Sequence, residues 1–199
     1  MRTIALAVMI AAALALVPIG GLGDSTSGLV TPTSRDGHKD FDFLMGTWHT
    51  HYRLLQRRLA NDHTWYDCYG TSTVSSFWGG SGNLEDGDLQ CPHKYVGGMT
   101  LRLYNAGTHQ WSLYWGTRAL GLVPPPQIGH FNANHVGEFY ANDKYKDKLI
   151  VVRFKWELRA GDHPYFEQAF SADNGKTWEP NWTTVYTRIS SEAVRSPSP

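Results

Sequence analysis

The sequence predicts an all-β fold, an up-and-down antiparallel β-barrel of about 8–10 strands with one short N-terminal helical turn. Short runs rich in β-branched and aromatic residues recur between turns of Gly, Pro, Asn and Asp. Aromatic residues form 13% of the chain and alternate along these runs. Beyond a single turn at residues 40–45, no stretch of the predicted domain shows the apolar period of about 3.6 residues that a helix needs.

The predicted strands are joined by hairpin turns throughout. No crossover helix separates them, so neighbours along the chain are expected to pair antiparallel. The Gly- and Asp-rich stretch that ends at Cys91 is expected to be a loop. In order, the predicted strands are residues 48–58, 64–77, 98–105, 111–117, 127–131, 136–142, 149–158, 165–172 and 177–189.

The two ends of the chain are expected to lie outside the barrel. Residues 1–23 have one early cation, an apolar run at 4–17 and then small residues, which is the layout of a secretory signal peptide; an uncleaved anchor is the alternative. Residues 24–39 are a polar, flexible leader, 40–190 the barrel domain, and 191–199 a disordered tail. The mature protein is then expected to be exported to the periplasm or the extracellular medium, with no stable membrane insertion after cleavage.

Charge and cysteine content narrow the function classes. The 18 basic and 18 acidic residues balance, so the sequence carries no basic footprint for nucleic acid. Cys68 and Cys91 are the two cysteines of the chain, and two cysteines alone make a poor metal site. In an oxidising compartment they could form one disulfide; a pair of free thiols is the open alternative.

Two motifs resemble catalytic or metal signatures but are better explained as structure. Residues 171–178 (SADNGKTW) match the Asp-box of sialidase propellers, where it is a repeated, non-catalytic hairpin tip; one copy in this chain predicts a hairpin. His49 and His51 share a strand face, but no carboxylate follows to complete a metal site, so both are expected on the surface. No metal and no cofactor are predicted.

The longest apolar connection, residues 118–127, contains three consecutive prolines. A packed Pro-rich turn and a lid over the open end of the barrel both explain it, and the sequence favours neither.

A candidate site follows from strand register. Trp48 and Arg188 are expected to meet as a plug at the closed end of the barrel. Successive hairpins would then align a row of side chains on one face with the last strand. If Arg188 covers Trp48 inside the barrel, this row faces the interior, whereas a one-residue register slip would make it an external ion-pair ladder. The row consists of Glu138, Arg153, Glu167 and Trp182.

Several segments together resemble the bacterial DUF1579 family, which is regarded as a lipocalin-like barrel of the calycin superfamily. Gly46-x-Trp48 with Arg188 is similar to the calycin end-plug signature. The resemblance implies a barrel that holds a small ligand, and it supplies no catalytic residues. The chain lacks the glycine-rich loop and proximal His of nitrobindin-like haem barrels. The segments are 41–48 (FDFLMGTW), 79–83 (GGSGN), 101–104 (LRLY), 111–115 (WSLYW), 137–140 (GEFY), 152–156 (VRFKW) and 167–182.

We therefore expect a small-molecule binding protein whose partner is a small apolar or aromatic ligand. Arg153, held by Glu138 and Glu167, would anchor a polar group of that ligand. A cavity enzyme, an isomerase, cyclase or hydrolase using these two carboxylates as acid and base, is the first alternative. A structural protein whose aromatic side chains fill the barrel is the second. The expected aromatic walls are Trp115, Tyr140, Trp182 and Tyr186.

Overall fold

The computed structural model describes residues 28–31, 33–160 and 163–191 of the 199-residue chain. The predicted signal peptide at 1–23 lies outside the described residues, as do the first residues of the leader and the tail from residue 192 onward.

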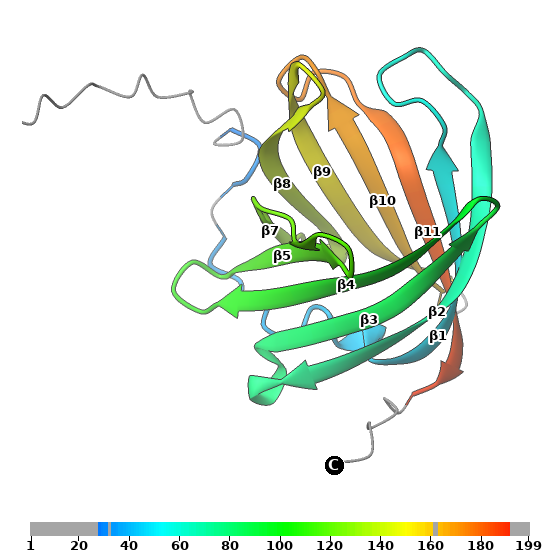
Figure 1. Cartoon of the computed structure of the whole chain (residues 1–199). Helices are drawn as coiled ribbons and strands as arrows, with labels where there is room; N and C mark the ends of the chain where they lie inside the picture. Colours follow the sequence, from blue (N-terminus) through cyan, green and yellow to red (C-terminus); the bar gives the residue numbers. More distant parts are fainter. Residues whose placement is uncertain (1–27, 32, 161–162, 192–199) are drawn as a thin grey trace, which may run out of the picture.

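Ten antiparallel strands of the described residues close into one barrel, so the predicted all-β, up-and-down barrel is confirmed (Figure 1). Each strand pairs with its neighbours along the chain, β11 pairs with β1, and the two-residue β6 (Gly121–Leu122) extends the edge of β5. The ten strands are β1 (Gly46–Leu55), β2 (Trp65–Phe77), β3 (Gly82–Cys91), β4 (Lys94–Asn105), β5 (Gln110–Thr117), β7 (Gln127–Phe131), β8 (Val136–Tyr145), β9 (Lys148–Arg159), β10 (His163–Ser171) and β11 (Glu179–Ser190).

The strand pleat sorts side chains between an aromatic interior and a polar exterior. In β9, Val152, Phe154 and Trp156 are buried in the barrel, while Arg153 and Lys155 point to the other face. The same alternation in the other strands builds the core from both sides, and edge-to-face ring contacts are frequent in it.

The closed end of the barrel is held by Trp48 and Arg188. The short 3-10 helix η1 (Asp42–Leu44) leads into β1, and Trp48 is 0% exposed with its indole N–H donating to Leu44 O at 2.8 Å. Arg188 Cζ lies 3.9 Å from the centre of the Trp48 ring, and the guanidinium donates to Met45 O and Phe43 O at 2.8 and 3.0 Å. The plug therefore also satisfies carbonyls that the end of a helical turn leaves without partners.

Gly46 is required at this end. Its φ is +118°, and a Cβ there would lie 2.3 Å from Ser190 O. Only glycine allows β1 to start so close to the end of β11, which places Trp48 beneath Arg188.

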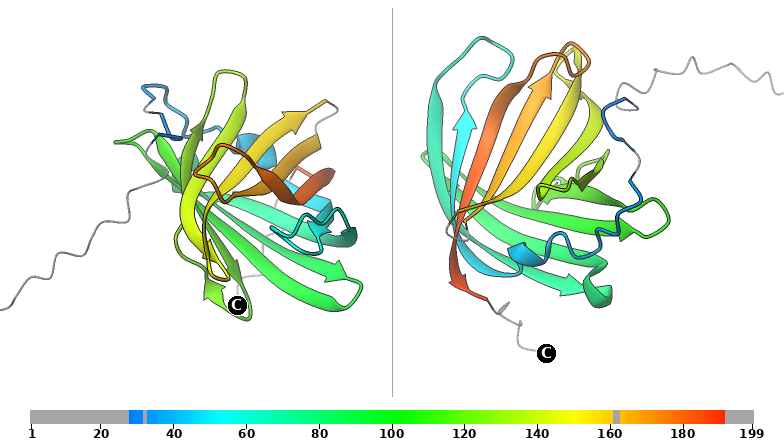
Figure 2. Two further views of the ribbon diagram at one scale, coloured as in Figure 1. Left: turned by 90° about the horizontal axis from the view of Figure 1, so that it is seen from above. Right: turned by 180° about the vertical axis from the view of Figure 1, so that it is seen from behind.

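The described part of the predicted leader lies against the outside of the barrel and leads to η1 (Figure 2). Gly37 donates its N–H to Tyr104 Oη at 3.0 Å and accepts from Trp111 Nε1 at 2.9 Å. Arg35 pairs with Asp40 at 2.6 Å. These contacts hold residues 35–40 on β4 and β5, although a flexible leader was expected here.

One strand, β3, was wrongly predicted to be a loop. It pairs with β2 over most of its length and with β4 from Gly82 to Cys91. The alternation of inward and outward residues cannot be recognised in its polar sequence, because the inward-facing Glu85 is charged and pairs with Arg102 of β4. Cys91 at its end forms a disulfide with Cys68 of β2, across a sequence separation of 23.

Candidate functional site

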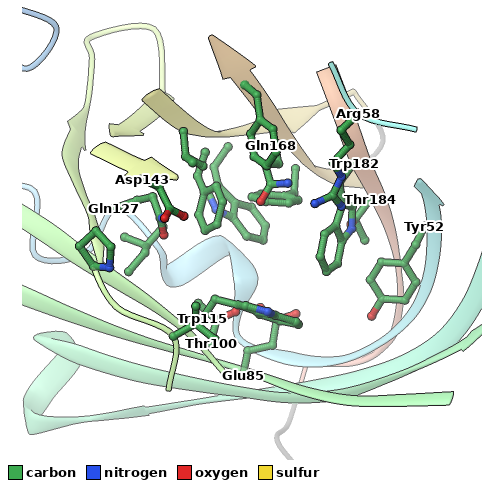
Figure 3. A pocket seen from close by; sticks show the side chains of 18 of the residues that line it. Tyr52, Arg58, Glu85, Thr100, Trp115, Gln127, Asp143, Gln168, Trp182 and Thr184 are labelled. Carbon is green, nitrogen blue, oxygen red and sulfur yellow. The ribbon is translucent and has the colours of Figure 1, made fainter. Parts of the chain in front are cut away.

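The barrel encloses a cavity of about 270 Å³ that opens at the end opposite the plug (Figure 3). β1 starts at the plug, so its far end and the following loop lie at the open end; by the antiparallel order, so do the β5–β7 loop and the end of β8. Residues from all three places line the cavity. Its aromatic walls are Tyr52, Trp115, Tyr145, Phe154, Trp156, Phe166, Phe170, Trp182 and Tyr186.

Three of the predicted ligand-binding residues line this cavity. Trp115 and Trp182 meet edge to face with ring centres 5.3 Å apart, and the Trp182 indole N–H donates to Thr184 Oγ1 at 3.1 Å. Trp115 lies over Gly98, where a Cβ would sit 2.4 Å from its ring. Tyr186 lines the cavity and packs against Trp48 of the plug.

The other four predicted residues do not line the cavity: Glu138, Tyr140, Arg153 and Glu167 occupy the outer face of β8, β9 and β10. The expectation that the polar row faces the interior is therefore wrong for Glu138, Arg153 and Glu167, and Tyr140 is not one of the aromatic walls of the cavity.

The predicted polar group nevertheless forms on the outer face. Arg153 Nη2 donates to Glu167 Oε1 at 2.9 Å, and its Nη1 lies 3.9 Å from Glu138 Oε1. Tyr140 Oη donates to Glu138 Oε2 at 3.0 Å. Trp178, from the Asp-box hairpin, covers this group with its ring centre 4.7 Å from Arg153 Cζ.

A β-bulge in β11 explains why this group lies outside while Trp182 lies inside. Gln168 pairs with Trp182 but Ala169 pairs with Pro180, so Asn181 is an extra residue in β11. Asn181 is fully buried, and its amide oxygen accepts from Gln168 Nε2 at 2.7 Å. The register predicted from the hairpin turn set Glu167 opposite Trp182, one residue away from the observed pairing.

The cavity floor is built on a buried ion pair that the sequence prediction missed. Arg102 is 0% exposed, pairs with Glu85, and donates to Asn83 Oδ1 at 3.0 Å. Glu85 also accepts from Ser72 Oγ at 2.7 Å and Tyr186 Oη at 2.9 Å. Burial and the adjacent Glu85 charge raise the pKa of the Tyr186 phenol well above its ordinary value, so it stays a donor. The sequence could have predicted this ion pair from two opposite charges at inward-facing positions of neighbouring strands. That prediction requires β3 to be recognised as a strand first.

At the open end, Arg58 reaches into the cavity from the β1–β2 loop (Figure 3). The sequence pattern predicts that Arg58 ends a strand and indicates no role for it. Its Cζ lies 5.3 Å from the Phe170 ring centre, and burial lowers the pKa of its guanidinium. The next residue, Leu59, donates its N–H to Glu179 Oε1 at 2.7 Å, which ties this loop to the start of β11.

The Pro-rich β5–β7 loop borders the same opening. Val123 donates its N–H to Trp115 O at 2.8 Å, and Val123, Pro124 and Pro125 line the cavity, while Leu120 is 74% exposed. The loop is thus a Pro-rich turn packed on the barrel, and it forms part of the rim.

The histidines expected on the surface do not form a metal site. His49 is exposed, and His51 stacks on Tyr69 with its Nε2 2.6 Å from Asp67 Oδ1. Among residues 28–31, 33–160 and 163–191, no three His, Cys, Asp or Glu side chains gather into a group that could hold a metal ion. In the same part of the chain, no helix has the length and apolarity needed to span a membrane.

Comparison with known proteins adds no assignment. No protein-family model matches the chain, and no curated protein matches it. The barrel and its cavity are therefore the features that bear on function.

Proposed function

We propose that this protein binds a small, largely apolar ligand inside its barrel. The observation that carries the proposal is the cavity itself: about 270 Å³, aromatic on most sides, and open at the end away from the Trp48–Arg188 plug. This volume is close to the lower end of the range of about 300–1,000 Å³ that is usual for ligand pockets. A barrel whose aromatic side chains served only as core would leave voids little larger than a water molecule.

The polar groups around the cavity favour binding over catalysis. The acid/base alternative depended on Glu138 and Glu167, which lie outside the cavity. The carboxylates that do line it, among the described residues, are Glu85 and Asp143. Glu85 already accepts hydrogen bonds from Ser72 and Tyr186 besides its ion pair, and Asp143 is exposed. The geometry thus supplies a shaped apolar space without a free acid/base pair.

Tryptophan fluorescence tests the proposal directly, because Trp115, Trp156 and Trp182 line the cavity. Titration with small aromatic and aliphatic compounds is expected to change the emission saturably, and native mass spectrometry is expected to show one bound molecule per chain. Thr100→Phe should abolish the response by filling the cavity. The matched control Thr71→Phe, at an exposed position of β2, should retain it. A wild-type barrel that binds nothing from a broad small-molecule panel would refute the proposal.

Export and family membership are part of the same proposal. The apolar N-terminal run supports secretion through a signal peptide, and the Gly46-x-Trp48 plug with Arg188 supports kinship with DUF1579 and other lipocalin-like barrels. The disulfide between Cys68 and Cys91 fits an oxidising compartment. Expression of the full chain in a bacterium, followed by cell fractionation and N-terminal sequencing, tests secretion: retention of Met1 in a cytoplasmic product would contradict it.

A further inference from the structure

We propose that the ligand of this cavity is a monocarboxylic acid whose carboxylate pairs with the guanidinium of Arg58 at the rim, while its apolar body lies among the aromatic walls. The inference rests on the proposed function and names the chemical class of ligand for the same site.

Arg58 is the one basic side chain of the described residues that lines the cavity. Within the described part of the chain it forms no ion pair, which sets it apart from the arginines nearby in sequence or in the barrel wall. Arg57 pairs with Asp62 at 3.2 Å, Arg102 with Glu85, and Arg153 with Glu167. The site therefore holds a positive charge that no ion pair with a described residue neutralises.

The surroundings of Arg58 favour an anion. Its guanidinium lies against Phe170, and desolvation by burial lowers its pKa more than the neighbouring Tyr145, Tyr66 and Glu179 raise it. An anion that enters the cavity meets this charge in a medium less polarisable than water, where the attraction is stronger. A guanidinium presents parallel N–H donors that match the two oxygens of a carboxylate, and it remains protonated at all physiological pH values.

The loop that carries Arg58 is held in place at several points. Leu59 donates its N–H to Glu179, Gln56 donates its N–H to Thr64 O at 2.9 Å, and Arg57 is tied to Asp62. A fixed loop loses little conformational entropy on binding, so the guanidinium is prepared for a ligand.

The acidic groups near the cavity leave this position open. Glu179 accepts a hydrogen bond from the Leu59 N–H, and its charge is the smallest of the influences on the pKa of Arg58, with which it forms no ion pair. Glu85 lies at the floor with Arg102 as its counterion. Asp143 lies on the other side of the cavity from Arg58 in the close-up view (Figure 3). The electrostatics thus orient an acid with its head group toward Arg58 and its apolar end toward the interior.

The cavity volume limits the size of the acid. About 270 Å³ corresponds to about nine water molecules at roughly 30 Å³ each, so an acid of about ten heavy atoms fills it. A monocyclic aromatic acid such as 3-phenylpropanoate has this size. Its amide, 3-phenylpropanamide, has nearly the same shape and no charge, and is therefore the matched probe.

The test compares these two probes by calorimetric titration at neutral pH. Wild type is expected to bind the acid roughly 10-fold or more tightly than the amide, the effect of one charge-assisted hydrogen-bonded pair. Arg58→Met should weaken acid binding about 10- to 100-fold and leave amide binding within about 2-fold. Arg58→Lys should retain part of the preference for the acid. The control Arg53→Met removes the same charge from a largely exposed position of β1, near the same end of the barrel and outside the cavity lining, and should leave the preference unchanged.

Each outcome separates this inference from the proposed function. Equal binding of acid and amide by wild type, or equal loss of both in Arg58→Met, overturns the carboxylate pairing while the cavity remains a binding site. Loss of the preference in Arg53→Met as well as in Arg58→Met shows a diffuse charge effect of this end of the barrel and also overturns it. If wild type binds neither probe nor any member of the neutral panel, the proposed function fails and the inference falls with it. Thermal melts of all variants establish that each is folded.

Discussion

Replacing Glu85 with Gln removes the charge that balances Arg102 beneath the cavity. Arg102 is 0% exposed, so the variant leaves a guanidinium buried with neutral partners only. The new amide also brings two N–H donors into a place where Arg102, Ser72 and Tyr186 all donate. Removing one partner of a buried ion pair costs about 3–5 kcal/mol.

This cost is large enough to measure by urea unfolding and by thermal denaturation followed by circular dichroism. For a domain of this size each kcal/mol lowers Tm by about 2–4 °C, so Glu85→Gln is expected to lower Tm by about 6–20 °C. Glu157→Gln is the control, because Glu157 pairs with Arg159 at 2.8 Å on the outside of the barrel. An ion pair of that kind contributes about 0–1 kcal/mol.

The double variant Glu85→Gln/Arg102→Met separates two contributions to the free energy of unfolding: the destabilisation by an unbalanced buried charge and the stabilisation by the ion pair itself. Methionine removes the uncompensated charge from between the Phe41 and Trp156 rings, so the double variant should recover much of the stability lost in Glu85→Gln. A loss below about 1 kcal/mol in Glu85→Gln would refute this account of the cavity floor. A double variant less stable than the single one would show that the ion pair itself, and not its imbalance, stabilises the barrel.

Three further predictions concern pH and the disulfide. The raised pKa of Tyr186 means that its contribution to the free energy of unfolding is complete below about pH 10 and is lost as pH rises further, which urea titrations at alkaline pH should show in wild type and much less in Tyr186→Phe. Hydrogen bonds from the Thr177 side chain and backbone lower the pKa of Asp173 to about 2, so its contribution is present above about pH 4 and lost between pH 4 and 2; Asp173→Asn should abolish that part of the acid dependence. Replacing Cys68 and Cys91 with Ser opens a loop with a sequence separation of 23 and should lower the free energy of unfolding by about 3 kcal/mol, and an unchanged urea midpoint would contradict this.

The barrel could be predicted because most of its strands alternate aromatic or β-branched residues with polar ones, and because hairpin turns separate them. The contact between Trp48 and Arg188 followed from the same reasoning, since it joins the first strand to the last in a closed sheet. In β3 the sequence signal failed. Glu85 is charged, as residues of loops often are, yet it faces inward and pairs with Arg102 of β4. That β3 is a strand can therefore be recognised only when the sequence of β4 is considered with it.

Arg58 was missed for a different reason. A predicted strand extending to residue 58 treats its side chain as one of an alternating series, whereas β1 ends at Leu55 and the chain turns inward over the rim. Leu59 has a φ of +55°, in the left-handed region, which is rare for leucine and which a sequence pattern does not predict. The rim of the cavity was therefore the least predictable part of the site, although it carries the charge that sets the proposed ligand class.

The position of Glu167 on the outer face shows the limit of predicting, from one strand to the next, which residues face the interior. Arg188 meets Trp48 as the phase of β11 requires, and Tyr186, Thr184 and Trp182 all face inward from it. The phase does not carry over to β10 as predicted, because the extra residue Asn181 shifts the register that a count from the hairpin turn assigns. The bulge lies inside the strand, where Asn181 is buried and bonded to Gln168, so it costs no unsatisfied amide. A face assigned across a hairpin is thus reliable only when the residues between turn and site contain no buried Asn or Gly that could form a bulge.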